Sequence, residues 1–394
     1  MRSAVTSGRA SGWPLREHIA LLGQTLAATQ IGDFAAAEAA LQAVLSHPFH
    51  AVCRWHHWLA ALIEAWLAER RGQRVRALDH LGRAFAIGRE YGFDFGPMPF
   101  SCGDMMPRLA ALALAHDIDA AFARHLIRRH ALPTPADAGE HWPWPIRIRT
   151  LGAFAVERAG TPAAAVRKES RKPQDLLKLL VALAPPSGGG PVPVERLCAA
   201  LWPDAQGDAA RNSFDNTLHR LRKLLGGERQ VLLQTGGLSL DGGICWIDAS
   251  ALHSCLAELD GLPANAEAAP LLMLTNRALT LYRGPFLAGE DELPDVVAAR
   301  VRIEARFIRH MAAAGARLVS AGHPLDAVRV FERVLELQPL AEDICRHLIS
   351  CLIALGRRAE AFDAYRRCRQ QLSVLLNLRP APETETLIDP IRHL

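Results

Sequence analysis

Five polar side chains with the chemistry to contact nucleic acid recur along the stretch ARNSFDNTLHRLRKLLG, residues 210–226. If the stretch is helical, with about 100° per residue, all five lie within about 60° of the direction opposite Phe214. They are Asn212, Asn216, His219, Arg220 and Lys223. Amides can pair with adenine, guanidinium groups can pair with guanine, and cations neutralise phosphates. The residue types and their spacing therefore indicate a surface that binds nucleic acid.

The opposite side of the same predicted helix is apolar. Phe214, Leu218, Leu221 and Leu225 form one narrow stripe that must face a core. An ordinary solvated face usually mixes acidic and basic residues, whereas the polar face here contains no acid. A merely solvated face is the alternative interpretation, and the elements on either side of the helix argue against it.

The two ends of this segment add further cations. The helix is expected to begin at Asp208 as its N-cap, and its first turn, which includes Arg211, would present free N–H groups to a phosphate. A second basic cluster lies in the loop RKESRK before the first helix of the segment, at Arg167, Lys168, Arg171 and Lys172. Contact with the DNA backbone and a solvated loop are equally open interpretations of this second cluster.

The elements that would position the polar helix follow a definite order. Residues 146–160 alternate short apolar stretches and predict strands with a turn. Helices are predicted over residues 175–184 and 194–202, each followed by a proline, and a β-hairpin is predicted over residues 231–248. Three helices followed by a hairpin is the winged helix-turn-helix plan, and strands before the first helix suggest its OmpR-type variant.

The regions on either side are helical and carry an internal repeat. Glycine followed five residues later by alanine, and four residues after that by a larger apolar residue, recurs from Gly32, Gly72, Gly322 and Gly356. In tetratricopeptide (TPR) helical hairpins, glycine permits the tight turn and alanine permits close helix approach. TPR-like repeats are therefore predicted, most clearly in the C-terminal region. Ordinary alanine-rich helical packing is the alternative.

The predicted fold class is mainly α with a small α+β module, an OmpR-type winged helix-turn-helix between TPR-like helical-repeat regions. Four parts are expected along the chain. They are an N-terminal helical region (1–130), a proline-rich linker (131–145), the winged helix (146–248) and a C-terminal helical domain (249–394).

Composition supports this division. The 394-residue chain has a net charge of +4. Residues 146–248 contain 14 basic and 10 acidic residues, so this segment alone accounts for the whole positive excess of the chain. The first residues lack the apolar core of a secretory signal, and no apolar run is long enough to span a bilayer. The eight cysteines are scattered without a C-x-x-C pair and are predicted to be reduced core residues. A cytoplasmic protein without a membrane partner is expected.

Catalytic, cofactor and metal motifs were sought without result. The sequence contains no phosphate-binding loop, no H-E-x-x-H and no G-x-S-x-G, and no paired carboxylates stand out. His56 and His57 in CRWHHW would point about 100° apart on a helix, which makes them a poor ligand pair. Aromatic packing is predicted for them instead. The chain is therefore expected not to be an enzyme and to need no cofactor or metal.

From about Ile146 to its end, the chain resembles the SARP-like antibiotic-regulatory activators, which join an OmpR-type winged helix to a bacterial transcriptional activator domain. The similar stretches are IRIRTLGAFAVERAG, VERLCAALWPD, ARNSFDNTLHRLRKLLG, LYRGPFLAG and GRRAEAFDAYRRCRQQLSVLLNLRPAPETETLI. The resemblance implies a transcriptional activator that binds double-stranded promoter DNA and recruits RNA polymerase. By position, its recognition helix is Asp208 to Leu225, whose contacts would be Arg211 and the five outward residues.

Some features depart from that family. A long helical region precedes the winged helix, which commonly stands at the N-terminus of family members. The hairpin tip QTGGLSLDGG has no basic residue, which argues against a minor-groove contact by a wing arginine. The C-terminal repeats are expected to form a dimer or regulatory surface, and the N-terminal helices to sense a signal or partner. The alternative function is a TPR-type protein–protein scaffold without specific DNA binding.

Overall fold

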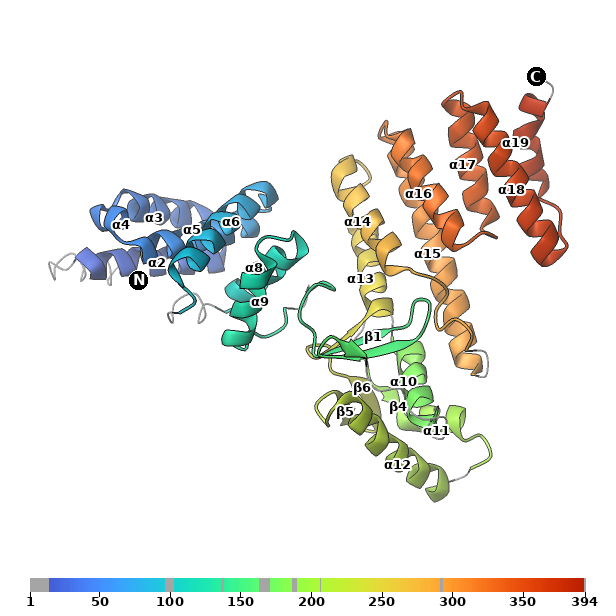
Figure 1. Ribbon diagram of the computed structural model, residues 1–394, viewed down its shortest axis with the longest axis horizontal. Coiled ribbons are helices and arrows are strands. Elements are labelled where there is room, and N and C mark those ends of the chain that lie inside the picture. Colours follow the sequence, from blue (N-terminus) through green and yellow to red (C-terminus); the bar gives the residue numbers. More distant parts are fainter. Residues whose placement is uncertain are drawn as a thin grey trace. The chain divides into compact units, whose positions relative to one another are not determined.

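The structure is a computed structural model that describes residues 14–95, 103–135, 138–162, 171–185, 190–205, 207–290 and 293–392. The chain divides into two compact units, Met1–Pro143 and Trp144–Leu394 (Figure 1). Both units are rich in helices, and short strands occur in the second one. The predicted fold class, mainly α with a small α+β module, is confirmed.

The first unit is built from helices that pair in chain order. They are α2 (Pro14–Ile31), α3 (Phe34–Ser46), α4 (Pro48–Val52), α5 (Arg54–Arg70), α6 (Arg74–Tyr91), α8 (Met105–Ala115) and α9 (Ala120–Arg129). Helix α2 packs on α3, and α5 packs on α6. The core around α5 is aromatic, because Trp58, Trp66 and Phe85 are almost completely buried. The described residues between 131 and 145 form no helix or strand.

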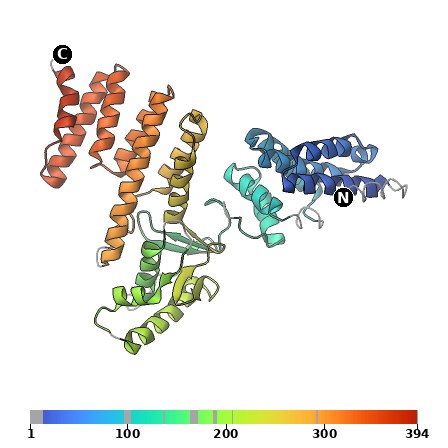
Figure 2. The ribbon, with the colours of Figure 1, turned by 180° about the vertical axis from the view of Figure 1, so that it is seen from behind.

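The second unit ends in a series of helices. They are α13 (Asp248–Gly261), α14 (Ala268–Leu281), α15 (Pro294–Ser320), α16 (Pro324–Leu337), α17 (Glu342–Ala354), α18 (Arg358–Leu376) and α19 (Pro382–Arg392). Consecutive helices lie side by side as hairpins, α13 on α14, α15 on α16 and α17 on α18 (Figures 1 and 2). We call this series the helical array.

The glycine–alanine repeat has the expected structural role in both units. Its glycines connect paired helices with positive φ, at Gly32 (81°), Gly72 (72°), Gly322 (82°) and Gly356 (74°). The alanines five residues later have no exposed surface. Gly315 marks a close approach of two helices, since a Cβ there would lie 2.2 Å from the Phe331 ring. The TPR-like packing predicted from the sequence is therefore present in both units. It includes the N-terminal copies, in which the sequence repeat is less clear.

The α+β module occupies the first part of the second unit. Its helices are α10 (Arg171–Leu183), α11 (Val194–Leu201) and α12 (Asp208–Leu225). One sheet has the order β3-β2-β1-β7, from β1 (Ile146–Arg149), β2 (Ala155–Arg158), β3 (Thr161–Pro162) and β7 (Cys245–Ile247). The other has the order β4-β6-β5, from β4 (Val192–Pro193), β5 (Val231–Gln234) and β6 (Gly237–Leu240). This is the predicted order of strands, three helices and hairpin.

The segment expected to be one hairpin, residues 231–248, contains three strands instead of two. Strands β5 and β6 form the hairpin, joined by Thr235 and Gly236, which both have positive φ as a type I′ turn requires. The chain then turns at Asp241, whose Oδ1 accepts the N–H of Gly243 at 2.8 Å. Strand β7 therefore leaves the hairpin and pairs in parallel with β1 in the other sheet.

Helix α10 begins earlier than the sequence predicts, at Arg171 instead of residue 175. Pro173 lies in the first turn of this helix. A missing N–H costs nothing there, because first-turn N–H groups have no partner within the helix. Arg171 and Lys172, which were expected in a loop, are therefore helical.

The module and the helical array are joined at Asp248, the first residue of α13. Its buried carboxylate accepts the N–H groups of Thr150 (2.8 and 2.9 Å), Leu151 (3.0 Å) and Ala249 (2.8 Å), and the hydroxyl of Thr150 (2.7 Å). A bridge between Leu151 and Phe286 adds a second junction. The boundary predicted between residues 248 and 249 thus falls within one compact unit.

Candidate nucleic-acid interface

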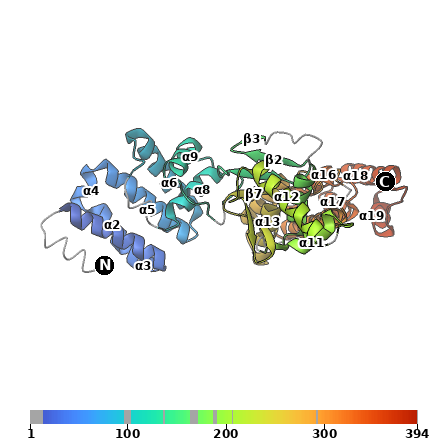
Figure 3. The same cartoon turned by 90° about the horizontal axis from the view of Figure 1, so that it is seen from below.

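Helix α12 lies at the end of the second unit away from α19 (Figure 1), and it faces the viewer when the molecule is seen from below (Figure 3). Its inner side packs against α10 and α11. The predicted apolar stripe is buried, since Phe214, Leu221 and Leu225 have no exposed surface and Leu218 retains 4%. Burial of one stripe fixes the rotation of the helix and so decides which residues face solvent.

The polar face of α12 points to solvent. Every residue assigned to it is exposed, namely Arg211, Asn212, Asn216, His219, Arg220 and Lys223. We call these six residues the polar face of α12. Their contact with DNA stays a prediction, but the rotation of the helix leaves all of them accessible.

Contacts within the helix hold part of this face in place. The Asn216 side chain donates to the carbonyl oxygen of Asn212 at 3.0 Å. Arg211 forms an ion pair with Asp215 at 3.6 Å, and its guanidinium lies 5.6 Å from the centre of the Phe214 ring. In the described parts of the chain, His219, Arg220 and Lys223 form no ion pair, so the C-terminal half of the face carries uncompensated positive charge.

The N-cap of α12 differs from the prediction. The N-cap is Gly207, with φ 53° and ψ −124°, and no side chain caps the helix. Asp208 is instead the first helical residue, where its carboxylate interacts favourably with the helix dipole. Glycine occupies the cap because the positive φ is inexpensive for it alone. The charge of Asp208 opposes the phosphate contact that we expected at this end.

The second basic cluster is divided by the structure. Arg167 and Lys168 lie outside the described residues. Arg171 and Lys172 are exposed in the first turn of α10. The Lys172 ammonium donates to the carbonyl oxygen of Leu201 at 3.0 Å and lies 5.9 Å from the Trp202 ring. Lys172 therefore ties α10 to the end of α11, and this internal contact competes with binding a phosphate.

Sequence reasoning missed a cation beside α12. A Cβ placed on Gly226, the C-cap of α12, would lie 2.6 Å from a guanidinium nitrogen of Arg158. Arg158 belongs to β2, so the strand pairing brings it to the C-terminal end of the helix, where a cation is favourable. The two residues are remote in sequence, and no local pattern signals their contact.

The first unit contains a histidine cluster that the sequence only partly revealed. His18 lies against His56 with ring centres 4.3 Å apart, and His50 lies against His57 at 4.5 Å. His47 is also adjacent to His18, at 5.2 Å. Packing was predicted for the pair in CRWHHW, and His56 is indeed 1% exposed. The contribution of α2 and of the α3–α4 turn was not foreseen, because it depends on tertiary packing.

Burial changes the acid–base behaviour of this cluster. Loss of solvation, followed by repulsion from the neighbouring imidazoles, lowers the pKa of His18 and of His56 to about 4. Burial likewise lowers the pKa of His50. Among the described residues, no group of three or more His, Cys, Asp or Glu is arranged to hold a metal ion.

The remaining sequence expectations concern cysteines and membranes. The seven described cysteines are free thiols, five of them buried and two, Cys53 and Cys198, half-buried. The eighth, Cys102, lies outside the described residues. No helix in the part of the chain that the structure describes combines the length and apolar character needed to cross a membrane.

Comparison with known proteins places these elements in context. Residues 247–392 match the family model described as the bacterial transcriptional activator domain. Two relatives, the transcriptional regulatory protein EmbR of Mycobacterium bovis and that of Mycobacterium tuberculosis, are each 27% identical over 252 residues. The match covers 61% of this chain and 62% of each relative, so it spans less than two thirds of their length.

A solved structure also matches, that of Mycobacterium tuberculosis EmbR in complex with a low affinity phosphopeptide, with 26% identity and a TM-score of 0.44. It covers 63% of this chain and 65% of that one. The matched activator domain begins where β7 ends and continues through the helical array to α19. The strands and helices of the α+β module precede it directly in the chain. The chain is thus similar to SARP-like transcriptional regulators.

Proposed function

We propose that this chain is a DNA-binding transcriptional regulator, most consistent with a SARP-like activator of promoters. In this proposal residues 146–248 bind double-stranded DNA, with α12 in the major groove. Residues 249–394 contact RNA polymerase or other proteins through the helical array and can serve as a dimer surface. The first unit senses a signal or partner. Such a protein works in the cytoplasm, where bacterial DNA lies.

The observation that carries the proposal is the polar face of α12. It presents two amides, an imidazole and three cations to solvent, and the neighbouring acid Asp215 is paired with Arg211. Amides and guanidinium groups suit base edges, whereas lysine suits phosphates. The named relatives are transcriptional regulators, which supports the same assignment.

A salt titration tests whether DNA is bound through these cations. Arg171, Arg211, Arg220 and Lys223 can neutralise about four phosphates, which predicts a slope of about −3 to −4 for log affinity against log salt concentration. Fluorescence polarisation with labelled duplex DNA at several salt concentrations measures it. A variant with Lys223→Gln should reduce the steepness of the slope by about one.

The competing function is a protein–protein scaffold. The helical hairpins in both units favour it, because stacked repeats offer extended binding surfaces. The same titration separates the two functions. Absence of measurable affinity for any duplex at low salt would support the scaffold and exclude the DNA-binding function.

A further inference from the structure

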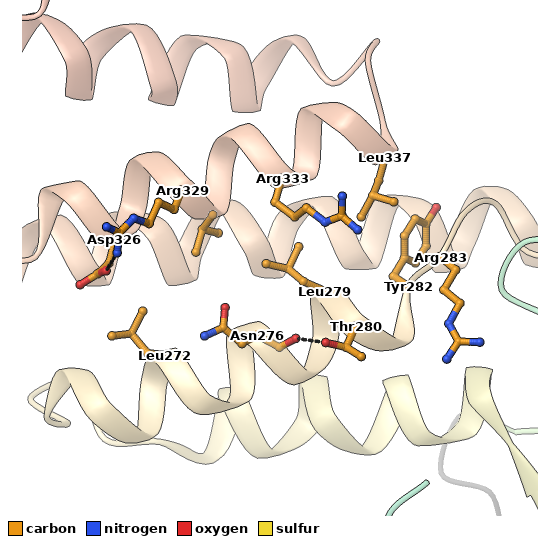
Figure 4. Close-up of a pocket in the computed structure, with 11 residues that line it drawn as sticks. Leu272, Asn276, Leu279, Thr280, Tyr282, Arg283, Asp326, Arg329, Arg333 and Leu337 are labelled. Atoms are coloured by element: carbon orange, nitrogen blue, oxygen red, sulfur yellow. Dashed lines mark hydrogen bonds and ion pairs between the residues drawn. The ribbon is translucent and has the colours of Figure 1, made fainter. Parts of the chain in front are cut away.

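A groove of about 600 Å³ lies between α14 and α16 of the helical array (Figure 4). One wall is the α14 face with Leu272, Asn276 and Leu279, which continues to Arg283 just beyond the helix. The other wall is the α16 face that runs from Asp326 to Leu337. Residues spaced by three or four share one helix face, so each wall is a continuous row. Each row extends for about 16 Å at 1.5 Å per residue.

The floor of the groove is apolar and rigid. Leu279 and Val330 line it and are buried, with 8% and 3% exposure. Tyr282 lies at one end and stacks on Phe307 of α15, with ring centres 4.0 Å apart. The hydroxyl of Tyr282 accepts a 2.6 Å hydrogen bond from the side chain of buried Gln338. These contacts hold Tyr282 in place at that end of the groove.

Charge is distributed unevenly along the groove. At one end Asp326, the acidic residue of the lining, pairs with Arg329 at 3.2 Å. Toward the other end lie Arg333 and Arg283, one from each wall (Figure 4). Arg333 is also paired with Glu336 at 2.5 Å, but both side chains are more than half exposed. Such exposed pairs contribute little, so a carboxylate of a ligand can replace Glu336.

The basic end adjoins the sheet of the winged helix. A Cβ placed on Gly152, in the β1–β2 turn, would lie 3.8 Å from the backbone of Arg283. Just beyond, the N–H of Leu287 donates to the carbonyl oxygen of Thr150 at 2.6 Å. Anything bound at this end therefore rests on the segment that links the helical array to the strands.

We propose that the groove binds an acidic amphipathic helix of a partner protein. Leucine-type side chains of that helix would rest on Leu279 and Val330, and carboxylates near one of its ends would pair with Arg283 and Arg333. Two parallel rows with helical spacing suit a helix lying in a groove better than a compact metabolite. The sign of the charge at the basic end selects an acidic partner over a basic one. The inference does not depend on DNA binding by α12.

The test measures binding of a designed peptide to the full-length chain by fluorescence polarisation. The probe is a labelled, alanine-based helical peptide of about 15 residues, long enough to be helical, with leucines on one face and three glutamates at one end. A second probe replaces the glutamates with glutamine. We expect the glutamate probe to bind, and the Arg283→Gln, Arg333→Gln double variant to bind it about tenfold more weakly.

Two further variants make the result specific. The exposed Thr280 lines the groove, and Thr280→Trp should obstruct it and weaken binding without changing any charge. The matched control is Arg366→Gln with Arg369→Gln, two exposed arginines on α18, which should leave binding unchanged. Circular dichroism checks that each variant is folded.

Three results would overturn the proposal. They are equal binding of the two probes, equal loss in the α18 control, and full displacement of the peptide by millimolar citrate, which would indicate a site for small anions. Duplex DNA binding is measured on the same variants. Retained DNA affinity in the groove variants would show that the loss of peptide is local to the groove.

Discussion

At the residue scale, Asn216 and Arg220 are the side chains on which base recognition by α12 depends most. Both are exposed and neither supports the core, so the Asn216→Ala, Arg220→Ala double variant should fold normally. We expect it to lose specific binding, by about 1–3 kcal/mol for each base contact removed. Competition between a specific site and random duplex DNA measures the loss.

A matched control for this double variant exists on the helical array. Arg369 and Gln370 are an exposed cation and amide on α18, far along the chain from α12. Their replacement by alanine should leave specific binding unchanged. Undiminished discrimination between specific and random DNA in the α12 variant would refute the recognition role of the polar face.

The histidine cluster predicts a loss of stability in acid. The pKa of His18 and of His56 is about 4 in the folded chain because they are buried, and about 6.5 in an unfolded chain. Between these values the unfolded state binds more protons, so the free energy of unfolding falls as pH decreases from about 6.5 to about 4. Thermal unfolding followed by circular dichroism across this range measures it.

Other titratable groups face His18 and His56 and could contribute to the loss of stability in acid. They are His47, which approaches Glu17 at 3.8 Å, together with His50 and His57. His56→Gln removes a buried titrating group and should make the decline with acid shallower. His323→Gln, at an exposed histidine of the α15–α16 turn, should not alter it. An unchanged pH profile in His56→Gln would contradict the assignment.

Which side chains face solvent on α12 could be predicted from the sequence, because helical periodicity alone orients Phe214 and the leucines inward. Contacts with residues from remote segments of the chain could not be predicted in this way. The approach of Arg158 to Gly226 depends on how β2 packs against α12, and the contact of His18 with His56 depends on how α2 packs against α5. Helical periodicity in the sequence shows which side of a helix is buried, but it does not show which other helix or strand packs against that side.

At the element scale, the close approach of α15 and α16 depends on Gly315. Because its Cβ position lies 2.2 Å from the Phe331 ring, Gly315→Ala must separate the helices or displace the ring. We expect the free energy of unfolding to fall by about 1–3 kcal/mol. Gly261→Ala, at a position with open space, is the control and should cause no loss. Adding Phe331→Leu to Gly315→Ala should restore part of the lost free energy of unfolding, because the smaller side chain leaves room for the new methyl group. If stability is not restored, overpacking is not the cause of the loss.

The junction between the α+β module and the helical array depends on Asp248. Asp248→Ala would leave the buried N–H groups of Thr150 and Leu151 without an acceptor. Such orphaned donors cost about 1–3 kcal/mol each, so we expect a loss of about 3 kcal/mol in the free energy of unfolding. Asp248→Asn keeps one acceptor oxygen and should therefore lower the free energy of unfolding by less than Asp248→Ala does. Equal stability of the alanine variant and the native chain, measured by urea unfolding, would contradict this role.

The order of elements in the α+β module followed from the sequence, and α12 has the predicted range of Asp208 to Leu225. The structure differs from the prediction where the local sequence is compatible with two different backbone conformations. Pro173 can end a preceding loop or begin a helix, and only packing of α10 decides for the helix. The separation of β7 from the hairpin likewise depends on its pairing with β1, which no local pattern encodes.

At the scale of the whole molecule, the second unit places two surfaces of different chemistry on one compact body. Helix α12 lies at its outer edge, and α14 and α16, which border the groove, belong to the helical array (Figure 1). Asp248 and the Leu151–Phe286 bridge connect the parts that carry them. The sequence predicts a domain boundary between residues 248 and 249, where its periodicity changes, and the hydrogen bonds of Asp248 cross that boundary.

In the proposed function, this chain binds particular DNA sequences through α12. Genome-wide mapping of the sites it occupies in its own cell, with the native chain and the Asn216→Ala, Arg220→Ala variant in parallel, tests this most directly. We predict discrete sites upstream of genes that share one sequence motif, and their loss in the variant despite equal protein levels. Absence of enriched sites, or the same sites in both chains, would contradict it.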